Sequence, residues 1–205
     1  MKSIDNKYTP IPMIKRYIST ATTLMLMLLV QAGVSTDILA AGDIERRDAT
    51  EHFFHQSFNN LDEELEVAEE EKKSGVFIMF TDKDCPWCLK MKTTIMNRAD
   101  VQDYYREHFR LLVIDINGDT LMTDFEGNEM EEKEFAFKQQ RVRATPVFMF
   151  FDTKGKKTMR LTGIVRDARE FLWLGEYVTD GDYQRTNFTR YKRERVKQEK
   201  QVSLK

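Results

Sequence analysis

The stretch VFIMFTDKDCPWC (residues 76–88) joins an unbroken apolar run to two closely spaced cysteines. Such a run, without polar alternation, is typical of a strand that is buried on both faces of a sheet. Cys85 and Cys88 are the only cysteines in the chain. A pair this close in sequence can form or break one disulfide reversibly, but it cannot link distant parts of a fold. We therefore expect the two thiols to carry chemistry.

A helix is predicted to begin at the two cysteines. Cys88, Met91 and Ile95 share one helical face, and Pro86 suits a first turn because its missing N–H has no helical partner there. The unpaired N–H groups and partial positive charge of a helix start stabilise a thiolate, the form of cysteine that attacks disulfides. Cys85 is thus the predicted nucleophile. Cys88 is the predicted resolving thiol, which attacks the mixed disulfide and frees the reduced substrate.

Hydrophobic periodicity predicts further elements on both sides of this stretch. We expect helices within residues 58–68, 101–109 and 131–140, and a final helix with Phe171, Leu174 and Val178 on one face. The first helix would place Phe58, Leu61, Leu65 and Ala68 together. Strands are expected at residues 111–116, 147–151 and 157–162, the last of them at an edge.

The succession of strand, helix and strand favours a right-handed parallel crossover. Two turn signals within residues 117–130 indicate an inserted hairpin or ordered loop. The sequence therefore predicts an α/β fold with a mixed central sheet flanked by helices, an N-terminal helical extension and this insertion.

The length of 205 residues suits one well-buried domain, and the formal net charge of -2 gives no reason to expect nucleic acid as a partner. Residues 1–41 have the order of a secretory signal peptide, with basic residues, an apolar stretch at 24–30 and small residues. An uncleaved membrane anchor is the alternative, although polar residues interrupt the apolar stretch. We predict a periplasmic protein with a domain at 42–180 and a basic tail at 181–205.

Three motifs, together with the order of elements, resemble the thioredoxin fold over about residues 61–178. They are the Cys-x-x-Cys, Thr145-Pro146 before a strand, and Gly163 just after the edge strand. The resemblance implies a cis bond before Pro146, which would lie beside the sulfurs as part of the catalytic site, and a Thr145 backbone that pairs with an extended substrate. It also implies substrate contacts for Trp87 and Gly163, no cofactor and no bound metal.

The chain also resembles, within this fold, the SoxW-type periplasmic thioredoxin-like proteins. The likeness lies in NGD (117–119), MTDFEG (122–127) and DYQRTNFTRY (182–191). It implies a reductase that exchanges disulfides with disulfide-bearing substrate proteins and receives electrons from a membrane donor; nothing in the sequence demands more than a monomer. One departure is Met79, which stands where many thioredoxins keep a buried aspartate as a proton acceptor.

Closely spaced cysteines also occur in haem-attachment and zinc sites. Covalent haem attachment needs a histidine after the second cysteine, and Leu89 stands there instead. A zinc site needs four ligands, and His52 and His55 are spaced so that they would complete a two-cysteine, two-histidine set. A disulfide oxidase or isomerase, or a non-catalytic thioredoxin-fold binding module, is the alternative function. Asp82 and Asp84 raise a nearby thiol pKa whereas Lys83 lowers it, so the sequence does not determine the redox potential.

The C-terminal tail carries more basic than acidic residues. One interpretation is a solvated helix whose start is packed onto the domain by Phe188 and Tyr191. The other is attraction to anionic lipid headgroups or to an acidic partner.

Overall fold

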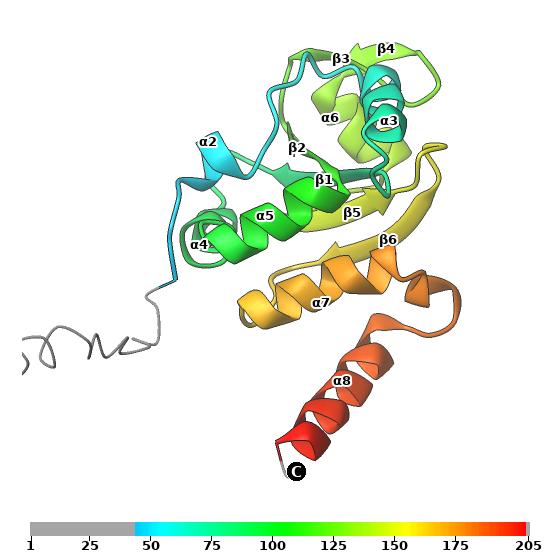
Figure 1. Cartoon of the computed structure of the whole chain (residues 1–205). Coiled ribbons are helices and arrows are strands. Elements are labelled where there is room, and N and C mark those ends of the chain that lie inside the picture. The colour runs from blue at the N-terminus through cyan, green and yellow to red at the C-terminus, as the bar shows by residue number, and fades with distance from the viewer. Residues whose placement is uncertain (1–43, 204–205) are drawn as a thin grey trace, which may run out of the picture. The chain divides into compact units, whose positions relative to one another are not determined.

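A four-stranded mixed sheet, in the order β2-β1-β5-β6, forms the centre of the computed structural model, which describes residues 44–203 (Figure 1). The strands are β1 (Val76–Thr81), β2 (Arg110–Asp115), β5 (Val147–Phe151) and β6 (Lys157–Thr162). β1 runs parallel to β2 and antiparallel to β5, and β5 pairs antiparallel with β6 at the edge. The predicted α/β fold, its parallel crossover and its strands are thereby confirmed.

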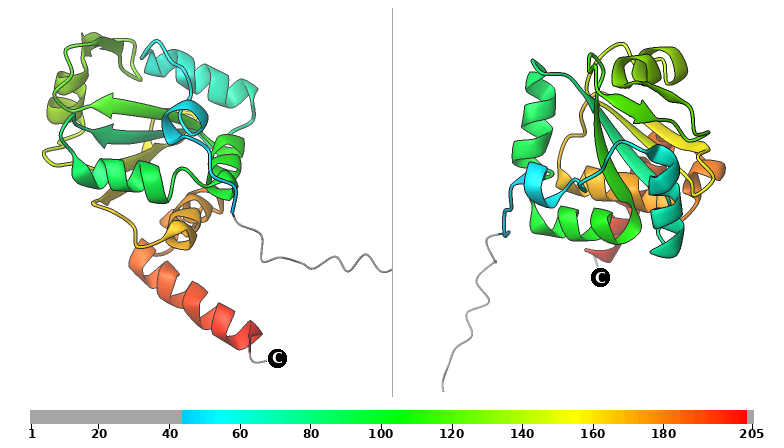
Figure 2. Two further views of the ribbon diagram at one scale, coloured as in Figure 1. Left: turned by 90° about the vertical axis from the view of Figure 1, so that its left-hand side faces the viewer. Right: turned by 90° about the horizontal axis from the view of Figure 1, so that it is seen from above.

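The two faces of the sheet bury separate apolar clusters because alternate side chains of a strand point to opposite sides. Phe77 and Met79 of β1 belong to one cluster, which packs against α4 (Pro86–Thr94), α5 (Ala99–His108) and α7 (Ala168–Thr179). Val76, Ile78 and Phe80 belong to the other, which packs against α3 (Leu61–Glu70) and the π-helical turn η2 (Phe135–Gln139). Helices therefore cover both faces (Figure 2).

The inserted segment forms a small two-stranded hairpin, β3 (Leu121–Thr123) and β4 (Glu129–Glu131), as expected. Asp124 lies in its turn, is 2% exposed, and accepts hydrogen bonds from the backbone N–H groups of Glu126 and Asn128. The helix predicted at 131–140 is split into α6 (Glu132–Glu134) and η2. Its position is correct, but most of it has π-type rather than α-type hydrogen bonds.

The prediction that Phe58 belongs to the first helical face is wrong. Phe58 is 97% exposed and precedes the helix. Asn60 is the N-cap of α3 and accepts a hydrogen bond from the N–H of Glu63 at 3.4 Å, while Asn59 has a positive φ of 59°. An asparagine N-cap preceded by a left-handed residue sets the start of α3 after Asn60, so the helix does not extend back to Phe58. Leu61, Leu65 and Ala68 do share the buried face.

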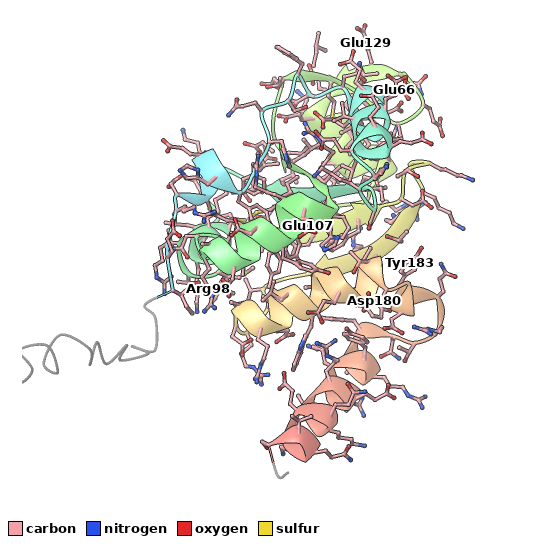
Figure 3. All side chains as sticks on the ribbon, in the orientation of Figure 1. Glu66, Arg98, Glu107, Glu129, Asp180 and Tyr183 are labelled. Atoms are coloured by element: carbon pink, nitrogen blue, oxygen red, sulfur yellow. A yellow bond between two sulfur atoms is a disulfide. The ribbon has the colours of Figure 1, made fainter. Side chains whose placement is uncertain are left out.

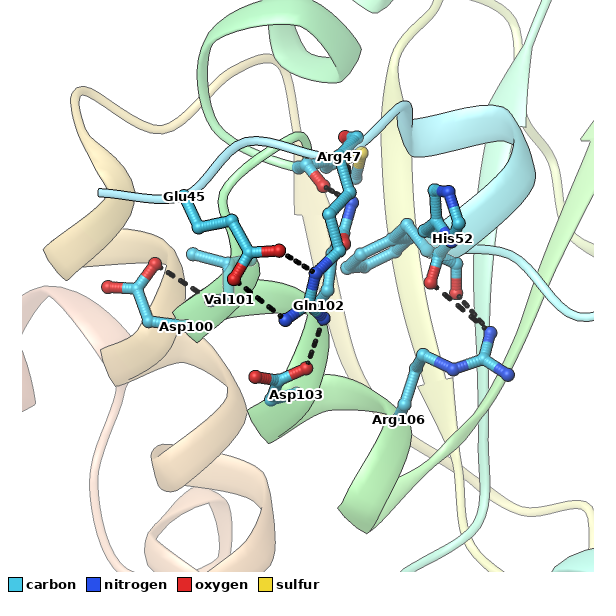
Figure 4. Close-up of polar contacts among 10 residues, drawn as sticks. Glu45, Arg47, His52, Asp100, Val101, Gln102, Asp103 and Arg106 are labelled. Carbon is cyan, nitrogen blue, oxygen red and sulfur yellow. Dashed lines mark hydrogen bonds and ion pairs between the residues drawn. The ribbon is translucent and has the colours of Figure 1, made fainter. Parts of the chain in front are cut away.

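The segment before α3, which includes the short helix α2 (Ala49–His52), is tied to α5 by polar contacts (Figure 4). Arg47 pairs with Asp103 at 2.6 Å. The side-chain amide of Gln102 donates to the backbone carbonyl of Arg47 at 3.1 Å, and Arg106 donates to the carbonyls of residues 52–54. These contacts hold the N-terminal extension against the domain.

The chain ends with the short 3-10 helix η3 (Asp182–Gln184) and the long helix α8 (Phe188–Val202). Phe188 and Tyr191 are both 6% exposed, and their rings lie 5.4 and 5.2 Å from that of Tyr177 on α7. This confirms that the tail is a helix packed on the domain by these two residues.

On other helices, charged side chains such as Glu66 and Glu107 point outward into solvent (Figure 3).

The predicted signal peptide at residues 1–41 lies outside the described residues. Among the helices that the structure does describe, none combines the length and the apolar character that a bilayer-spanning segment requires. The boundaries at 42–180 and 181–205 stay predictions; residues from Ile44 onward form one compact unit.

Candidate active site

The two cysteines lie at the start of α4, where the sequence predicted a helix to begin. Cys85 is the N-cap, and its Sγ accepts a hydrogen bond from the backbone N–H of Cys88 at 3.0 Å. Pro86 occupies the first turn. The side chains form a disulfide. This N–H group and the positive end of the helix dipole lie at the Cys85 sulfur, an arrangement that favours a thiolate there once the disulfide is reduced.

A shallow pocket of about 450 Å³ opens beside this disulfide. Cys85 is 9% exposed at its wall, and Cys88 is 3% exposed. Trp87 is half-exposed, and Leu89 is largely exposed. The pocket is lined by Thr81, Asp82, Lys83, Asp84, Cys85, Pro86, Cys88, Leu89 and Lys92. Cys85 is therefore accessible from the pocket, and apolar side chains lie at its rim.

The loop before β5 packs against the turn that leads to the cysteines. The peptide bond between Thr145 and Pro146 is cis, as the resemblance implied. The hydroxyl of Thr145 donates to Asp82 Oδ2 at 2.7 Å, and Asp82 Oδ1 accepts from the backbone N–H of Asp84 at 2.9 Å. Asp82 thus connects the two loops, a role that the sequence analysis missed. The Asp-x-Asp turn was a readable signal, but its bond to Thr145 was not.

Gly163 lies beside this proline: its backbone N–H donates to the carbonyl of Pro146 at 2.9 Å. Its φ is 90°, and a Cβ added there would meet no atom within 4 Å. Glycine is therefore needed for the backbone conformation and not for space. The structure brings the pair Thr145 and Pro146 next to Gly163, and it brings Trp87 next to the cysteines. The catalytic and substrate-binding roles of these residues stay predictions.

The side of the sheet beneath the disulfide is apolar. Met79, fully buried, belongs to the same cluster as Cys85, Cys88 and Met91. Lys92, which also lines the pocket, has its ammonium 5.5 Å from the centre of the Phe54 ring. Burial lowers the pKa of Lys92, and Asp48 opposes that shift only in part. Asp82, Lys83 and Asp84 are the other titratable residues that line the pocket, and among them Lys92 is a lysine that gives up its proton more readily than usual.

The zinc interpretation finds no support in the positions of the histidines. His55 is held against β2, with its Nδ1 accepting from the N–H of Leu111 at 2.9 Å. Burial lowers the pKa of His55 to about 3, and the nearby cations Arg110, Arg106 and Lys73 add to the effect. Within residues 44–203 no group of three or more acidic, histidine or cysteine side chains is arranged to hold a metal ion.

A family model described as a thioredoxin-like domain matches residues 61–179. The chain belongs to the thioredoxin-like family. The matched range runs from the start of α3 to the end of α7 and so contains the disulfide, the cis-proline loop and Gly163. No curated protein matches this chain.

Several solved structures resemble this thioredoxin-like chain. A thioredoxin-fold protein from Helicobacter pylori is 23% identical with a TM-score of 0.56, and the match covers 74% of this chain and 94% of that one. A putative disulphide-isomerase from Bacteroides thetaiotaomicron is 26% identical with a TM-score of 0.45, covering 60% and 92%. The DsbD C-terminal domain from Neisseria meningitidis, reduced form, is 18% identical with a TM-score of 0.43, covering 57% and 96%. The first of these likenesses confirms the fold.

Proposed function

We propose that this chain is a thiol-disulfide oxidoreductase that works mainly as a reductase of disulfide-bearing partner proteins. The observation that carries the proposal is the placement of the Cys85–Cys88 disulfide at the start of α4, beside an open pocket. A disulfide that closes so short a loop contributes little to holding a fold together. Its position at a helix start is instead suited to lowering a thiol pKa.

The reaction begins with the dithiol form of the protein. The Cys85 thiolate attacks one sulfur of the partner's disulfide, and the other partner sulfur leaves as a thiolate and takes up a proton. Cys88 then loses its proton and attacks the Cys85 sulfur, which releases the second partner thiolate to be protonated. Two electrons pass to the partner, whose disulfide becomes a dithiol, and the protein is left with the disulfide present in this structure.

The proton on Cys88 needs an acceptor because apolar side chains surround this thiol. We propose that the proton leaves to water in the pocket that both cysteines line. Lys92 lines the same pocket, and while it is protonated its positive charge favours a thiolate there, as that of Lys83 does, whereas Asp82 and Asp84 oppose it. This route replaces the buried carboxylate that many thioredoxins place where Met79 stands here.

We further propose that the protein is exported, belongs to the SoxW type and is returned to its dithiol form by a membrane electron donor. Residues of the motifs that carry the SoxW likeness make hydrogen bonds that hold local structure in this chain, which supports the likeness. Asp124 organises the β3–β4 turn, and Asn187 caps α8 by accepting from the N–H of Arg190 at 3.0 Å.

The decisive experiment traps the mixed disulfide. We expect a Cys88→Ser variant, expressed in an exporting host, to retain partner proteins linked to Cys85, because the resolving attack is lost. Partners released by dithiothreitol and identified by mass spectrometry would name the substrates. A Cys85→Ser variant is the matched control and should retain none. If neither variant retains partners and the wild type does not cycle between dithiol and disulfide, the proposal is wrong.

The direction of the reaction is tested separately. We expect the wild type to catalyse insulin reduction by dithiothreitol and to have an equilibrium potential more reducing than that of glutathione. A potential well above that of glutathione would instead favour the oxidase or isomerase alternative. Absence of insulin reduction, with the disulfide intact, would favour a binding module.

A further inference from the structure

A groove crosses the surface between α7 and α8 and continues past the start of α7 to α4. It consists of two adjoining hollows of about 460 and 420 Å³ that share Arg166 and Glu170. The floor is apolar, with Trp173 and Val196 in the first hollow and Met91, Ile95 and Val165 in the second. Polar and charged side chains form the rim.

The rim of this groove is cationic. It carries Lys90, Arg166, Lys192, Arg193 and Lys197, while Glu170 is the acidic residue among those that line the two hollows. Glu170 is 8% exposed; it accepts from the N–H of Arg166 and forms an ion pair with Lys192. Its charge is therefore used within the protein, and Arg166 is paired with Asp167, so the positive charge that the groove presents to solvent comes from Lys90, Arg193 and Lys197.

Not every cation of α8 is free to bind a ligand. Arg190 pairs with Glu194, Lys192 with Glu170, and Arg195 with Glu176. Arg193 and Lys197 have no carboxylate within ion-pair distance among the described residues, and both are exposed. They lie one helical turn apart on the wall of the first hollow. They therefore remain available to pair with the carboxylates of a ligand that covers the apolar floor.

The second hollow lies beside α4, the helix that begins at the disulfide. It is lined by Lys90 and Met91 of α4, the second and third residues after Cys88, and the ammonium of Lys90 lies 5.3 Å from the Trp87 ring centre. Ile164, which also lines this hollow, follows Gly163, whose N–H donates to the carbonyl of Pro146. A chain whose cysteine meets Cys85 can thus continue along the groove toward α8.

We propose that this groove binds an acidic segment with interspersed apolar residues in the partner protein, next to the disulfide that is reduced. The inference rests on the proposed function and adds the class of substrate that it selects. Apolar side chains would cover Trp173 and Val196, and carboxylates would pair with Arg193 and Lys197. A protein segment fits better than an anionic membrane, because the free cations flank a concave apolar floor that leads to the disulfide.

The test measures binding and turnover separately in the full chain. The binding probe is a fluorescent synthetic peptide with alternating glutamate and leucine and no cysteine; a second peptide has lysine in place of glutamate. We expect the acidic peptide to bind more tightly, and the variant R193E/K197E to weaken its binding about tenfold, because each exposed ion pair contributes up to about fivefold. Added salt should weaken the binding further in the wild type. The matched control is K154E/K156E, which makes the same charge change in exposed lysines of the β5–β6 turn and should bind as the wild type does.

Turnover uses the same sequences with a cysteine added, oxidised to a disulfide and reduced with dithiothreitol as the electron source. R193E/K197E should lower kcat/KM for the acidic disulfide about tenfold and leave that for hydroxyethyl disulfide, a small neutral substrate, unchanged. Equal binding of both peptides, or equal losses in R193E/K197E and K154E/K156E, would overturn the inference. So would loss of binding to phosphatidylglycerol vesicles in R193E/K197E with peptide binding unchanged, because the cations would then face a membrane. If the protein does not reduce hydroxyethyl disulfide but still binds the acidic peptide, the proposed function is wrong and the inference that the groove binds acidic segments stands.

Discussion

Asp82 and Thr145 join two turns that are far apart in the chain, and this single contact orders the rim of the candidate active site. The Thr145 hydroxyl lies 2.7 Å from one carboxylate oxygen of Asp82, and the other oxygen holds the turn before Cys85. A hydrogen bond to an ionised group is stronger than one between neutral groups. The cysteine turn and the cis-proline loop are therefore positioned relative to each other before a substrate arrives.

Gly163 allows a direct test of the substrate contact that the thioredoxin resemblance implies. Gly163→Ala should lower the free energy of unfolding by about 1 to 2 kcal/mol because a residue with a Cβ is strained at φ 90°. The matched control is Gly127→Ala, because Gly127 has a φ of 82° and equally open surroundings but lies in the β3–β4 turn. We expect similar losses in urea unfolding, and a lower kcat/KM for insulin only in Gly163→Ala. Equal activity in the two variants would remove Gly163 from the substrate site.

The edge strand β2 is partly covered by the segment that follows α2. The backbone N–H of His55 donates to the carbonyl of Leu111 at 2.8 Å, and His55 Nδ1 accepts from the N–H of Leu111 at 2.9 Å. Together these bonds occupy backbone groups that an edge strand would otherwise leave unpaired. Only the unprotonated imidazole can accept this bond. The attachment of this segment therefore depends on the protonation of one histidine.

We expect stability to fall with pH in a range set by His55. Burial lowers its pKa in the folded protein to about 3, below the ordinary value of 6.5, so the unfolded chain binds this proton first. The contribution is complete above pH 6.5 and is lost progressively as the pH falls from there toward 3. Urea unfolding of the wild type at pH 7 and pH 5 should show the loss, and His55→Asn, which keeps an acceptor but does not titrate, should reduce it.

The control for this pH dependence is His52→Asn, because His52 lies on the exposed surface of the same segment. It should keep the pH dependence of the wild type. An unchanged difference between pH 7 and pH 5 in His55→Asn would mean that other groups cause it.

The contacts of α8 contribute to the stability of the domain, whereas the contact that the reaction of the cysteines requires does not involve α8. The helix is joined to α7 by Phe188 and Tyr191 at its start and by the pairs Lys192–Glu170 and Arg195–Glu176 further along. The disulfide lies on α4, whose sulfur-stabilising contact comes from its own backbone. Loss of the distal part of α8 should therefore affect stability and not the thiol chemistry.

A chain that ends at Tyr191 tests this separation. We expect a free energy of unfolding lower by about 1 to 3 kcal/mol, since the buried carboxylate of Glu170 loses Lys192. Its kcat/KM for hydroxyethyl disulfide should equal that of the full chain. The control is a chain that ends at Gln201, which keeps these pairs and should match the full chain in both measurements. A fall in turnover of the neutral disulfide in a still folded protein would contradict the prediction.

Local patterns were sufficient for most of the fold and for the cysteine pair. The apolar run at 76–80, the proline after Cys85 and the helical spacing of Cys88 and Met91 depend on neighbours in the sequence, and such short-range preferences are readable from it. The cis bond before Pro146 was predicted from the family resemblance and not from a local pattern. The start of the helix after Asn60 was missed because the helix was predicted from apolar spacing alone, which Phe58 fits, and the N-cap preference of Asn60 was not used.

Contacts between distant segments had to be seen in three dimensions. The bond from Thr145 to Asp82, the capture of His55 by Leu111, and the groove shared by α4, α7 and α8 all join residues that have no detectable relation in sequence. The physical reason is that hydrogen bonding, burial and charge pairing depend on distances in space. A single chain reveals side-chain types and their local spacing, whereas packing decides which cations find a carboxylate and which, like Arg193 and Lys197, are left facing solvent.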